Sequence, residues 1–211
     1  MVEFGFKLNS DKVFFTSDFH GEHAQPFLWE SRGFASPQAH TDGVIQSIND
    51  RVGTHDHLFN LGDFVLNCSR EKFEQILSRI NCQNIYFLWG NHNSQVKQAY
   101  KETILKDFGR QDIEVYPVRY KNLIFIGSYF EAIINGQPIV MSHYPLYSWN
   151  FMRKGSWMLS GHEHCAVKEH LPEGNGGKIL DVGWDYYKKP LAFEEIKSIM
   201  MKKSVKTVGH H

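Results

Sequence analysis

Side chains that bind metal ions recur in five short segments that lie far apart in the sequence. The donors are carboxylate and amide oxygens and imidazole nitrogens, and none is a thiolate. The segments are Asp18-Phe19-His20, Gly62-Asp63, Gly90-Asn91-His92, His143 and Gly161-His162-Glu163-His164. This mixture suits divalent ions such as manganese, iron, zinc or nickel. Six or seven donors exceed the needs of one tetrahedral zinc ion, so their number indicates two ions held close together.

Three of these segments follow directly on apolar, β-prone runs at residues 12–17, 57–61 and 84–89. We interpret the runs as buried strands, whose ends are rigid places from which to aim a ligand. Asp18 and His20 are two residues apart, as are His162 and His164, and such residues point the same way in an extended turn. Each segment alone could be a cap, a turn or a solvated histidine. Because all five occur in one chain, we expect the strand ends to converge on one site.

The order of the motifs resembles that of the calcineurin-like metallophosphoesterase family. The family pattern reads D-x-H, G-D, G-N-H-D/E, H and G-H-x-H, and the resemblance spans Asp18 to His164. The segment 181–185 is similar to the corresponding segment of small, uncapped bacterial or phage members of this family. The protein-phosphatase branch resembles the chain less, because Gly62-Asp63 is not followed by Asp-Arg-Gly. The resemblance implies hydrolysis of a phosphodiester or phosphomonoester with two divalent metal ions as cofactors.

The resemblance also implies a role for each site residue. The first ion would be held by Asp18, His20 and His164, the second by Asn91, His143 and His162, and both by a bridging Asp63. The implied mechanism is in-line attack at phosphorus by a hydroxide shared between the ions. His92 would protonate the leaving oxygen or steady the transition state. We expect manganese first, with iron, zinc or nickel as alternatives.

Asn93 departs from the family pattern, which places Asp or Glu directly after G-N-H. A carboxylate hydrogen-bonded to an imidazole raises the pKa of the imidazole, because it favours the cation. Asn93 could orient His92 through its amide oxygen, but it brings no charge. We therefore predict that His92 is a weaker proton donor than usual, so that the enzyme favours good leaving groups or depends on another acid. His23 is the candidate for that acid or for a phosphate contact, with a solvated loop histidine as the alternative.

Three further residues are predicted to contact the substrate. Arg32 lies in the long early loop, and Arg153 lies in the loop after His143, so either could reach a phosphate. Tyr144 belongs to an aromatic cluster whose loop members could stack on a base or another ring. The alternative for this cluster is a place in the core.

Length and composition fit one domain with a full hydrophobic core. Among the 211 residues, Lys plus Arg equal Asp plus Glu at 23 each, so no global positive field would hold nucleic acid without specificity. Cys68, Cys82 and Cys165 show no CxxC spacing, which favours a reducing compartment. We recognise no secretory signal and no apolar run of about 20 residues. We expect a soluble, cytoplasmic protein without membrane association or an obligate protein partner. Its single domain would cover residues 1–205, and the tail at 206–211 could be the stub of a purification tag.

The first half of the chain is predicted to alternate strands with helices. One helix is expected to be capped by Thr41 or Asp42, another to cover residues 70–80, and a third to cover residues 94–108 and be closed by Gly109. Residues 22–38 contain Pro and Gly and are expected to form a long loop.

The second half is expected to be mostly antiparallel β-structure, with a terminal helix at 191–201. Its strands are predicted at 113–116, 123–126, 129–135, 138–142, 157–160 and 178–182. Together the two halves predict an α+β fold, a four-layer αββα sandwich of two mixed β-sheets flanked by helices.

The substrate stays open at this point. It would be a small phosphate ester, including a nucleotide or a nucleic-acid end, so a nucleic-acid phosphatase or nuclease is an alternative. A catalytically weakened metal-binding scaffold is a second alternative, supported by Asn93 alone. The retention of every predicted ligand and of His92 argues against the scaffold.

Overall fold

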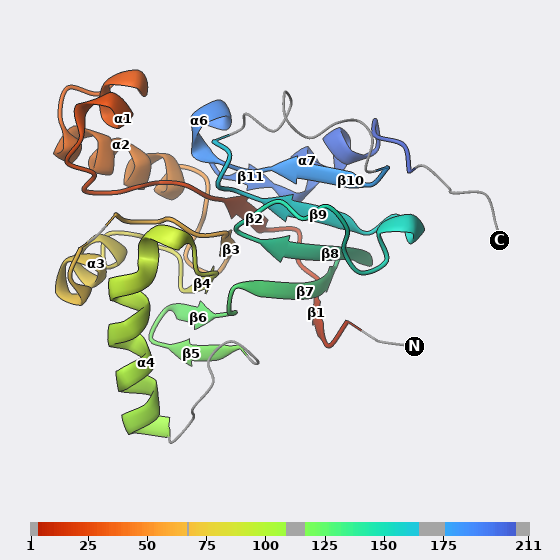
Figure 1. Cartoon of the computed structure of the whole chain (residues 1–211), viewed down its shortest axis with the longest axis horizontal. Coiled ribbons are helices and arrows are strands. Elements are labelled where there is room, and N and C mark those ends of the chain that lie inside the picture. Colours follow the sequence, from red (N-terminus) through yellow and green to blue (C-terminus); the bar gives the residue numbers. More distant parts are fainter. Residues whose placement is uncertain (1–3, 67, 109–116, 165–175, 206–211) are drawn as a thin grey trace.

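Two β-sheets lie face to face with helices around them in a computed structural model (Figure 1), which describes residues 4–66, 68–108, 117–164 and 176–205. One sheet has six strands in the order β11-β2-β3-β4-β6-β5, and the other has five in the order β1-β7-β8-β9-β10. Both sheets are mixed. This architecture confirms the predicted α+β fold of two mixed sheets flanked by helices.

The six-stranded sheet positions three of the five motifs. Its strands are β2 (Val13–Thr16), β3 (His57–Asn60), β4 (Asn84–Phe87), β5 (Val118–Tyr120), β6 (Leu123–Phe125) and β11 (Leu191–Ala192). The strands β2, β3, β4 and β6 run parallel, while β5 and β11 pair antiparallel at the two edges. Because neighbouring parallel strands end at the same edge, the segments that follow β2, β3 and β4 meet there.

The five-stranded sheet is less antiparallel than the sequence indicated. Its strands are β1 (Phe6–Leu8), β7 (Tyr129–Ile134), β8 (Gln137–Ser142), β9 (Trp157–Ser160) and β10 (Lys178–Asp181). Only β7 and β8 pair antiparallel, and the other neighbours run parallel. The prediction of mostly antiparallel strands is therefore wrong. The connection from β8 to β9 is long enough to return to the other end of the sheet, as a parallel crossover requires.

Alternating side chains divide the apolar residues into three layers. Residues such as Phe15 and Met141 fill the space between the two sheets. The outer face of the six-stranded sheet is covered by the helices α2 (Pro37–Asn49), α3 (Arg70–Leu77) and α4 (Ser94–Phe108) (Figure 1). The outer face of the five-stranded sheet is covered by the segment 144–156, where Trp149 and Met152 pack with Val140 of β8. This segment contains the short 3₁₀ helix η2 (Met152–Lys154).

Several element boundaries differ from the prediction. The expected loop 22–38 contains α1 (Pro26–Ser31), which has Pro at its start. The helix α2 begins at Pro37 with Ser36 as its N-cap, and Thr41 instead accepts a hydrogen bond from the Glu22 backbone N–H. The predicted terminal helix is the strand β11 followed by α7 (Phe193–Met200). Besides α1, three strands and one α-helix were not predicted, namely β1, β5, β11 and α6 (Trp184–Tyr187).

Some predicted features fall outside the described residues, namely the strand 113–116, Gly109, Cys165 and the tail 206–211. None of the helices in the described ranges combines the length and the hydrophobicity that a membrane-spanning segment needs.

Candidate metal centre

The first two motifs are tied together through their backbones at the end of β2 and β3. The Asp18 N–H donates to the Gly62 carbonyl at 3.1 Å, and the His20 N–H donates to the Asp63 carbonyl at 2.9 Å. The two turns therefore continue side by side beyond the sheet, which directs both sets of side chains to one place.

Two motif glycines permit this close approach of the loops. A Cβ on Gly90 would lie 2.6 Å from the backbone nitrogen of Asp63, and one on Gly161 would lie 2.7 Å from the Cβ of Ser17. Distances below 3.0 Å would force the backbone apart. The glycine in each motif is thus required by packing between loops that are distant in sequence.

The first group of donors consists of Asp18, His20 and His164. The Nε2 atoms of His20 and His164 lie 3.3 Å apart, and their rings stack with centroids 5.1 Å apart. His20 Nε2 is 3.9 Å from Asp18 Oδ1. The Nδ1–H of His164 donates to Asp185 Oδ2 at 2.7 Å, which leaves the His164 Nε2 lone pair facing His20. Two imidazole Nε2 atoms and a carboxylate therefore converge.

The second group of donors surrounds His143. The Nδ1–H of His143 donates to the Leu61 carbonyl at 2.9 Å, so its Nε2 lone pair faces the site. That Nε2 atom lies 3.1 Å from Asp63 Oδ2 and 2.9 Å from Asn91 Oδ1. Asn91 Oδ1 is also 3.1 Å from His162 Nδ1. The ligand atoms of Asp18, Asp63 and His143 also lie close enough together to hold a metal ion, so Asp18 is common to both groups.

The described structure thus brings all seven predicted ligands into one site. Five of them have a positive φ angle, namely Asp18, His20, Asp63, His162 and His164. Residues other than glycine rarely adopt this conformation, which costs on the order of 1–3 kcal/mol where it is strained. Such a concentration of unfavourable backbone angles is typical of a functional site.

The electrostatics of the first group fit a bound cation. Burial raises the pKa of Asp18 to about 6, and burial also lowers the pKa of His20 far below its usual value. Burial alone would raise the pKa of Asp63, but its interactions with His143, with the His92 backbone N–H and with His20 together lower that pKa. A divalent cation requires an ionised carboxylate and a neutral imidazole, and it would offset the cost of burying the Asp18 charge. The donor set therefore fits divalent metal ions.

Arg32 has a different environment from the one predicted for a substrate contact. Its Nε and Nη2 donate to the two carboxylate oxygens of Asp185 at 2.8 and 2.6 Å. Nη1 donates to the Phe19 carbonyl and to His40 Nε2, and Nη2 also donates to the Asp18 carbonyl. All five N–H groups have acceptors within the protein, and the side chain has no exposed surface. We revise the role of Arg32 to positioning Asp185 and the Asp18 backbone.

Asn93 does not use its amide oxygen to orient His92. That oxygen accepts the backbone N–H groups of Gly90 and Asp63, each at 3.0 Å, and the Asn93 Nδ2 donates to the Val65 carbonyl. The side chain is buried, so its amide fastens the second motif to the third. The prediction that Asn93 orients His92 is corrected accordingly.

His92 and His23 lie at the margin of the donor cluster. The His92 ring is 5.5 Å from the His20 ring, centroid to centroid, and its side chain is exposed. The His23 ring is 6.0 Å from the His20 ring, but this residue is buried, and its Nδ1 accepts the Gln25 N–H at 3.1 Å. The exposed His92 ring thus borders the donor cluster, whereas His23 is buried next to His20, and burial lowers its pKa.

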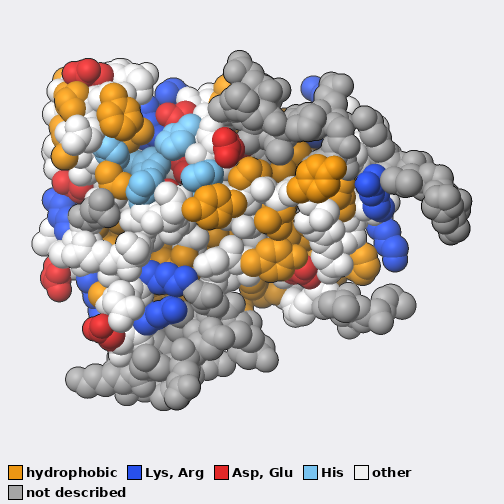
Figure 2. Space-filling model, viewed as in Figure 1, with side chains coloured by type: hydrophobic (Ala, Val, Ile, Leu, Met, Phe, Trp, Pro, Cys, Tyr) orange, Lys and Arg blue, Asp and Glu red, His pale blue; other side chains and the backbone are white. Residues whose placement is uncertain are grey.

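Exposed aromatic rings lie on both sides of the histidines. Tyr144 is 48% exposed, with its ring 4.4 Å from the His162 ring, and its contact with a substrate stays a prediction. Phe27, which the sequence did not single out, is 68% exposed beside His23. Arg153 is exposed on η2, further along the segment that follows His143. Figure 2 shows the histidines gathered on one face with hydrophobic side chains beside them.

The sequence also left the role of Asp185 unassigned, although a signal for it was present. Asp185 follows the strand β10 by four residues, and β10 runs parallel to β9, which carries His162 and His164 at its end. Because neighbouring parallel strands end at the same edge of a sheet, the Asp185 carboxylate is expected near His162 and His164.

Comparison with known proteins agrees with this geometry. The model of the calcineurin-like phosphoesterase family matches residues 11–166. The uncharacterised protein MJ1445 of Methanocaldococcus jannaschii is 23% identical over 202 residues, which cover 94% of this chain and 97% of that protein. The crystal structure of AQ665 from Aquifex aeolicus, a protein of unknown function, superimposes with a TM-score of 0.60 and 17% identity. The superposition covers 89% of this chain and 98% of the AQ665 chain, so the two proteins share the fold.

Members of the matched family typically bind divalent metals, and the match suggests metal-dependent hydrolysis of a phosphoester. Both the motif order and the convergent donors agree with it. The chain belongs to the calcineurin-like phosphoesterase family.

Proposed function

We propose that the protein is a dinuclear metal-dependent phosphoesterase that hydrolyses a phosphodiester or a phosphomonoester. The observation that carries this proposal is the convergence of two donor groups that share Asp18, within a site assembled from five separate motifs. A site for one ion would not need both groups. Manganese is the ion that we expect first, since carboxylate and amide oxygens suit it, and iron, zinc or nickel, which suit imidazole, are the alternatives.

Different residues of this chain have different roles in the proposed hydrolysis. A pair of divalent cations, when bound, supplies Lewis acidity and a nucleophile at neutral pH. Asp18 and Asp63 supply negative charge, and Asp185 orients the His164 ring by accepting its Nδ1–H. The exposed His92 imidazole is placed to donate a proton to the leaving oxygen. Tyr144 borders the site beside His162, where a substrate group would lie.

A phosphatase assay on the metal-loaded protein tests the proposal. We expect manganese-stimulated hydrolysis of bis-p-nitrophenyl phosphate or p-nitrophenyl phosphate, and the ratio of the two rates indicates the preference for diester or monoester. Asp63→Asn should lower both activity and the number of bound ions. Asp42→Asn is the matched control, because Asp42 is an exposed carboxylate paired with Arg79 on the surface.

The scaffold alternative makes the opposite prediction in the same assay. Full occupancy by metal without any metal-stimulated hydrolysis would favour a binding module. His92→Ala adds a second distinction, because it removes the proposed proton donor without removing a predicted ligand. We expect this variant to bind metal normally and to hydrolyse esters of poor leaving groups on the order of 10²-fold more slowly.

A further inference from the structure

The segment 144–156 runs from the metal centre along the outer face of the five-stranded sheet. His143 follows the carboxyl end of β8, whereas Trp157 begins β9, and these two strands are parallel. The segment must therefore travel the length of a strand, roughly 13 Å for four residues at about 3.3 Å each. One of its ends lies at the predicted ligands, and its η2 end lies toward the opposite end of the sheet.

Aromatic and basic side chains are exposed along this segment. Tyr144 is 48% exposed and Tyr147 is 75% exposed. Arg153 and Lys154 are exposed on η2, and the Lys154 Nζ lies 4.9 Å from the centroid of the Phe151 ring. With their neighbours, Tyr147, Phe151, Arg153 and Lys154 line a hollow of about 340 Å³.

Residues beneath the segment hold this surface in place. Trp149 is buried, and its Nε1–H donates to Ser156 Oγ at 3.0 Å. The Phe151 ring stacks on Phe4 with centroids 5.5 Å apart. On the face in Figure 2, a band of hydrophobic side chains leads away from the histidines, and Lys or Arg side chains lie beyond it. The exposed rings are thus presented by an anchored backbone.

We propose that the segment 144–154 binds a single-stranded oligonucleotide, one phosphate of which lies at the metal centre. The position of that phosphate rests on the proposed function. Unpaired bases stack on exposed aromatic rings, and phosphates pair with neighbouring cations, whatever the base sequence. A mononucleotide held at the metals would reach Tyr144 but not Arg153 and Lys154, whereas a short strand would reach all three. The zero net charge of the chain makes this local surface the source of affinity.

Binding to the metal-free protein tests the surface apart from catalysis. The probe is a fluorescein-labelled oligothymidylate of about eight nucleotides, followed by fluorescence anisotropy. Tyr147→Ala should weaken binding about tenfold, because it removes one stacking platform. Tyr147→Phe should bind like the unmodified protein, because it keeps the ring. Equal affinity of the unmodified protein and Tyr147→Ala would overturn the proposal.

The salt dependence of binding tests the basic end of the path. Replacing Arg153 and Lys154 together by Ala should reduce the slope of log K against log salt by about 1.4, the value for two phosphate contacts on a single strand. The matched control replaces Lys12 and Arg79, two exposed cations that lie just before β2 and just after α3. That control should leave the slope unchanged, and a slope that changes equally in both double variants would contradict the proposed path.

The hydrolysis and binding assays together distinguish a failure of the binding proposal from a failure of the proposed phosphoesterase function. Hydrolysis of bis-p-nitrophenyl phosphate by the unmodified protein, together with unaltered oligonucleotide binding by Tyr147→Ala, supports the phosphoesterase and overturns the binding path. Oligonucleotide binding that depends on Tyr147 without any hydrolysis of the aryl ester supports the path and contradicts the phosphoesterase. Binding of a duplex or a thymidine mononucleotide as tightly as the single strand would also overturn the proposal.

Discussion

Arg32, which is buried, and Asp185, which is partly exposed, form a bidentate ion pair that joins two sides of the metal centre. The Asp185 carboxylate accepts from Arg32 Nε and Nη2 at 2.8 and 2.6 Å, and it also accepts the Nδ1–H of His164 at 2.7 Å. Burial alone would raise the pKa of Asp185, but hydrogen bonds from His164 and Arg32 hold that pKa well below its usual range. The carboxylate is therefore ionised, and it fixes the orientation of a predicted ligand.

Asp185→Asn is expected to weaken metal binding at the group formed by Asp18, His20 and His164. The amide removes the negative charge that orients the His164 ring, and losses of this kind reduce metal affinity about 10–100-fold. Calorimetric titration with manganese should show one weakened site and one nearly unchanged site. Asp42→Asn serves as the control on the surface, and two equally weakened sites, or none, would contradict this role.

Gly161→Ala should destabilise the protein and disturb the site together. The new methyl group would lie 2.7 Å from the Ser17 Cβ, in a place that the loops cannot vacate without moving Asp18. The expected loss is about 1–3 kcal/mol in the free energy of unfolding, measured with urea. At Gly5 the corresponding methyl group would meet nothing within 4 Å, so Gly5→Ala should unfold like the unmodified protein. Equal stability of the two variants would refute the packing argument.

Asn93→Asp should not strengthen His92 as a proton donor. The Asn93 Nδ2 group faces the Val65 carbonyl at 3.2 Å, so a carboxylate there would place two acceptors against each other. We expect a loss of about 1–3 kcal/mol in stability and an unchanged alkaline limb in the pH–rate profile, the limb on which a proton donor is lost. An alkaline limb that shifts to higher pH, with a weaker dependence on the leaving group, would restore the hypothesis drawn from the sequence.

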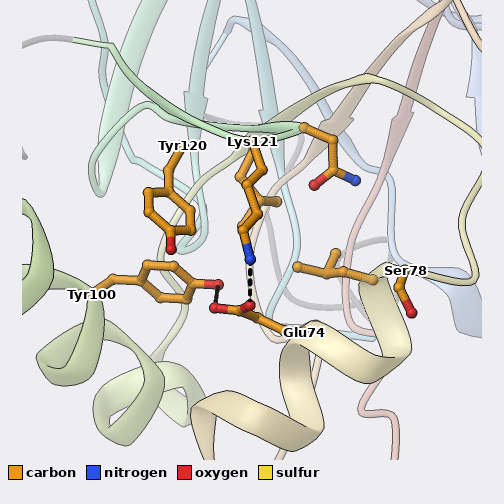
Figure 3. A pocket seen from close by; sticks show the side chains of 8 residues that line it. Glu74, Ser78, Tyr100, Tyr120 and Lys121 are labelled. Atoms are coloured by element: carbon orange, nitrogen blue, oxygen red, sulfur yellow. Dashed lines mark hydrogen bonds and ion pairs between the residues drawn. The ribbon is translucent and has the colours of Figure 1, made fainter.

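Glu74 provides a prediction on pH that is independent of the metal centre (Figure 3). Burial alone would raise its pKa, but Lys121 and Arg70, whose donor atoms each lie 2.8 Å from its carboxylate, lower it. A carboxylate with a lowered pKa adds stability above its unfolded pKa and loses it as the pH falls through the folded pKa. Glu74→Gln should therefore cost about 1 kcal/mol near pH 7, and this difference should disappear in acid.

Urea unfolding of both proteins across the acidic range checks that prediction. The matched control is Glu194→Gln, a more exposed carboxylate that pairs with Lys197 within one helix turn. It should alter stability less at every pH. A cost of Glu74→Gln that stays constant from neutral to acidic pH would exclude the charge as its cause.

The sequence by itself determined the fold class and the identity of the predicted ligands. Local spacing determines which side chains directly follow a strand, and neighbouring parallel strands end at the same edge of a sheet. Asp18, Asp63 and Asn91 could therefore be grouped without coordinates. The direction of the strands in the second half was not determined, because a crossover and a set of hairpins have similar local patterns.

Only the tertiary structure decided the partners of the charged and amide side chains around the ligands. Arg32 and Asp185 are 153 residues apart, and the Asn93 amide oxygen accepts the Asp63 N–H across 30 residues. Such pairings depend on how the sheets and loops pack in three dimensions, and side-chain type carries no information about distance. For that reason an arginine predicted to contact substrate proved to have its five donors satisfied inside the protein.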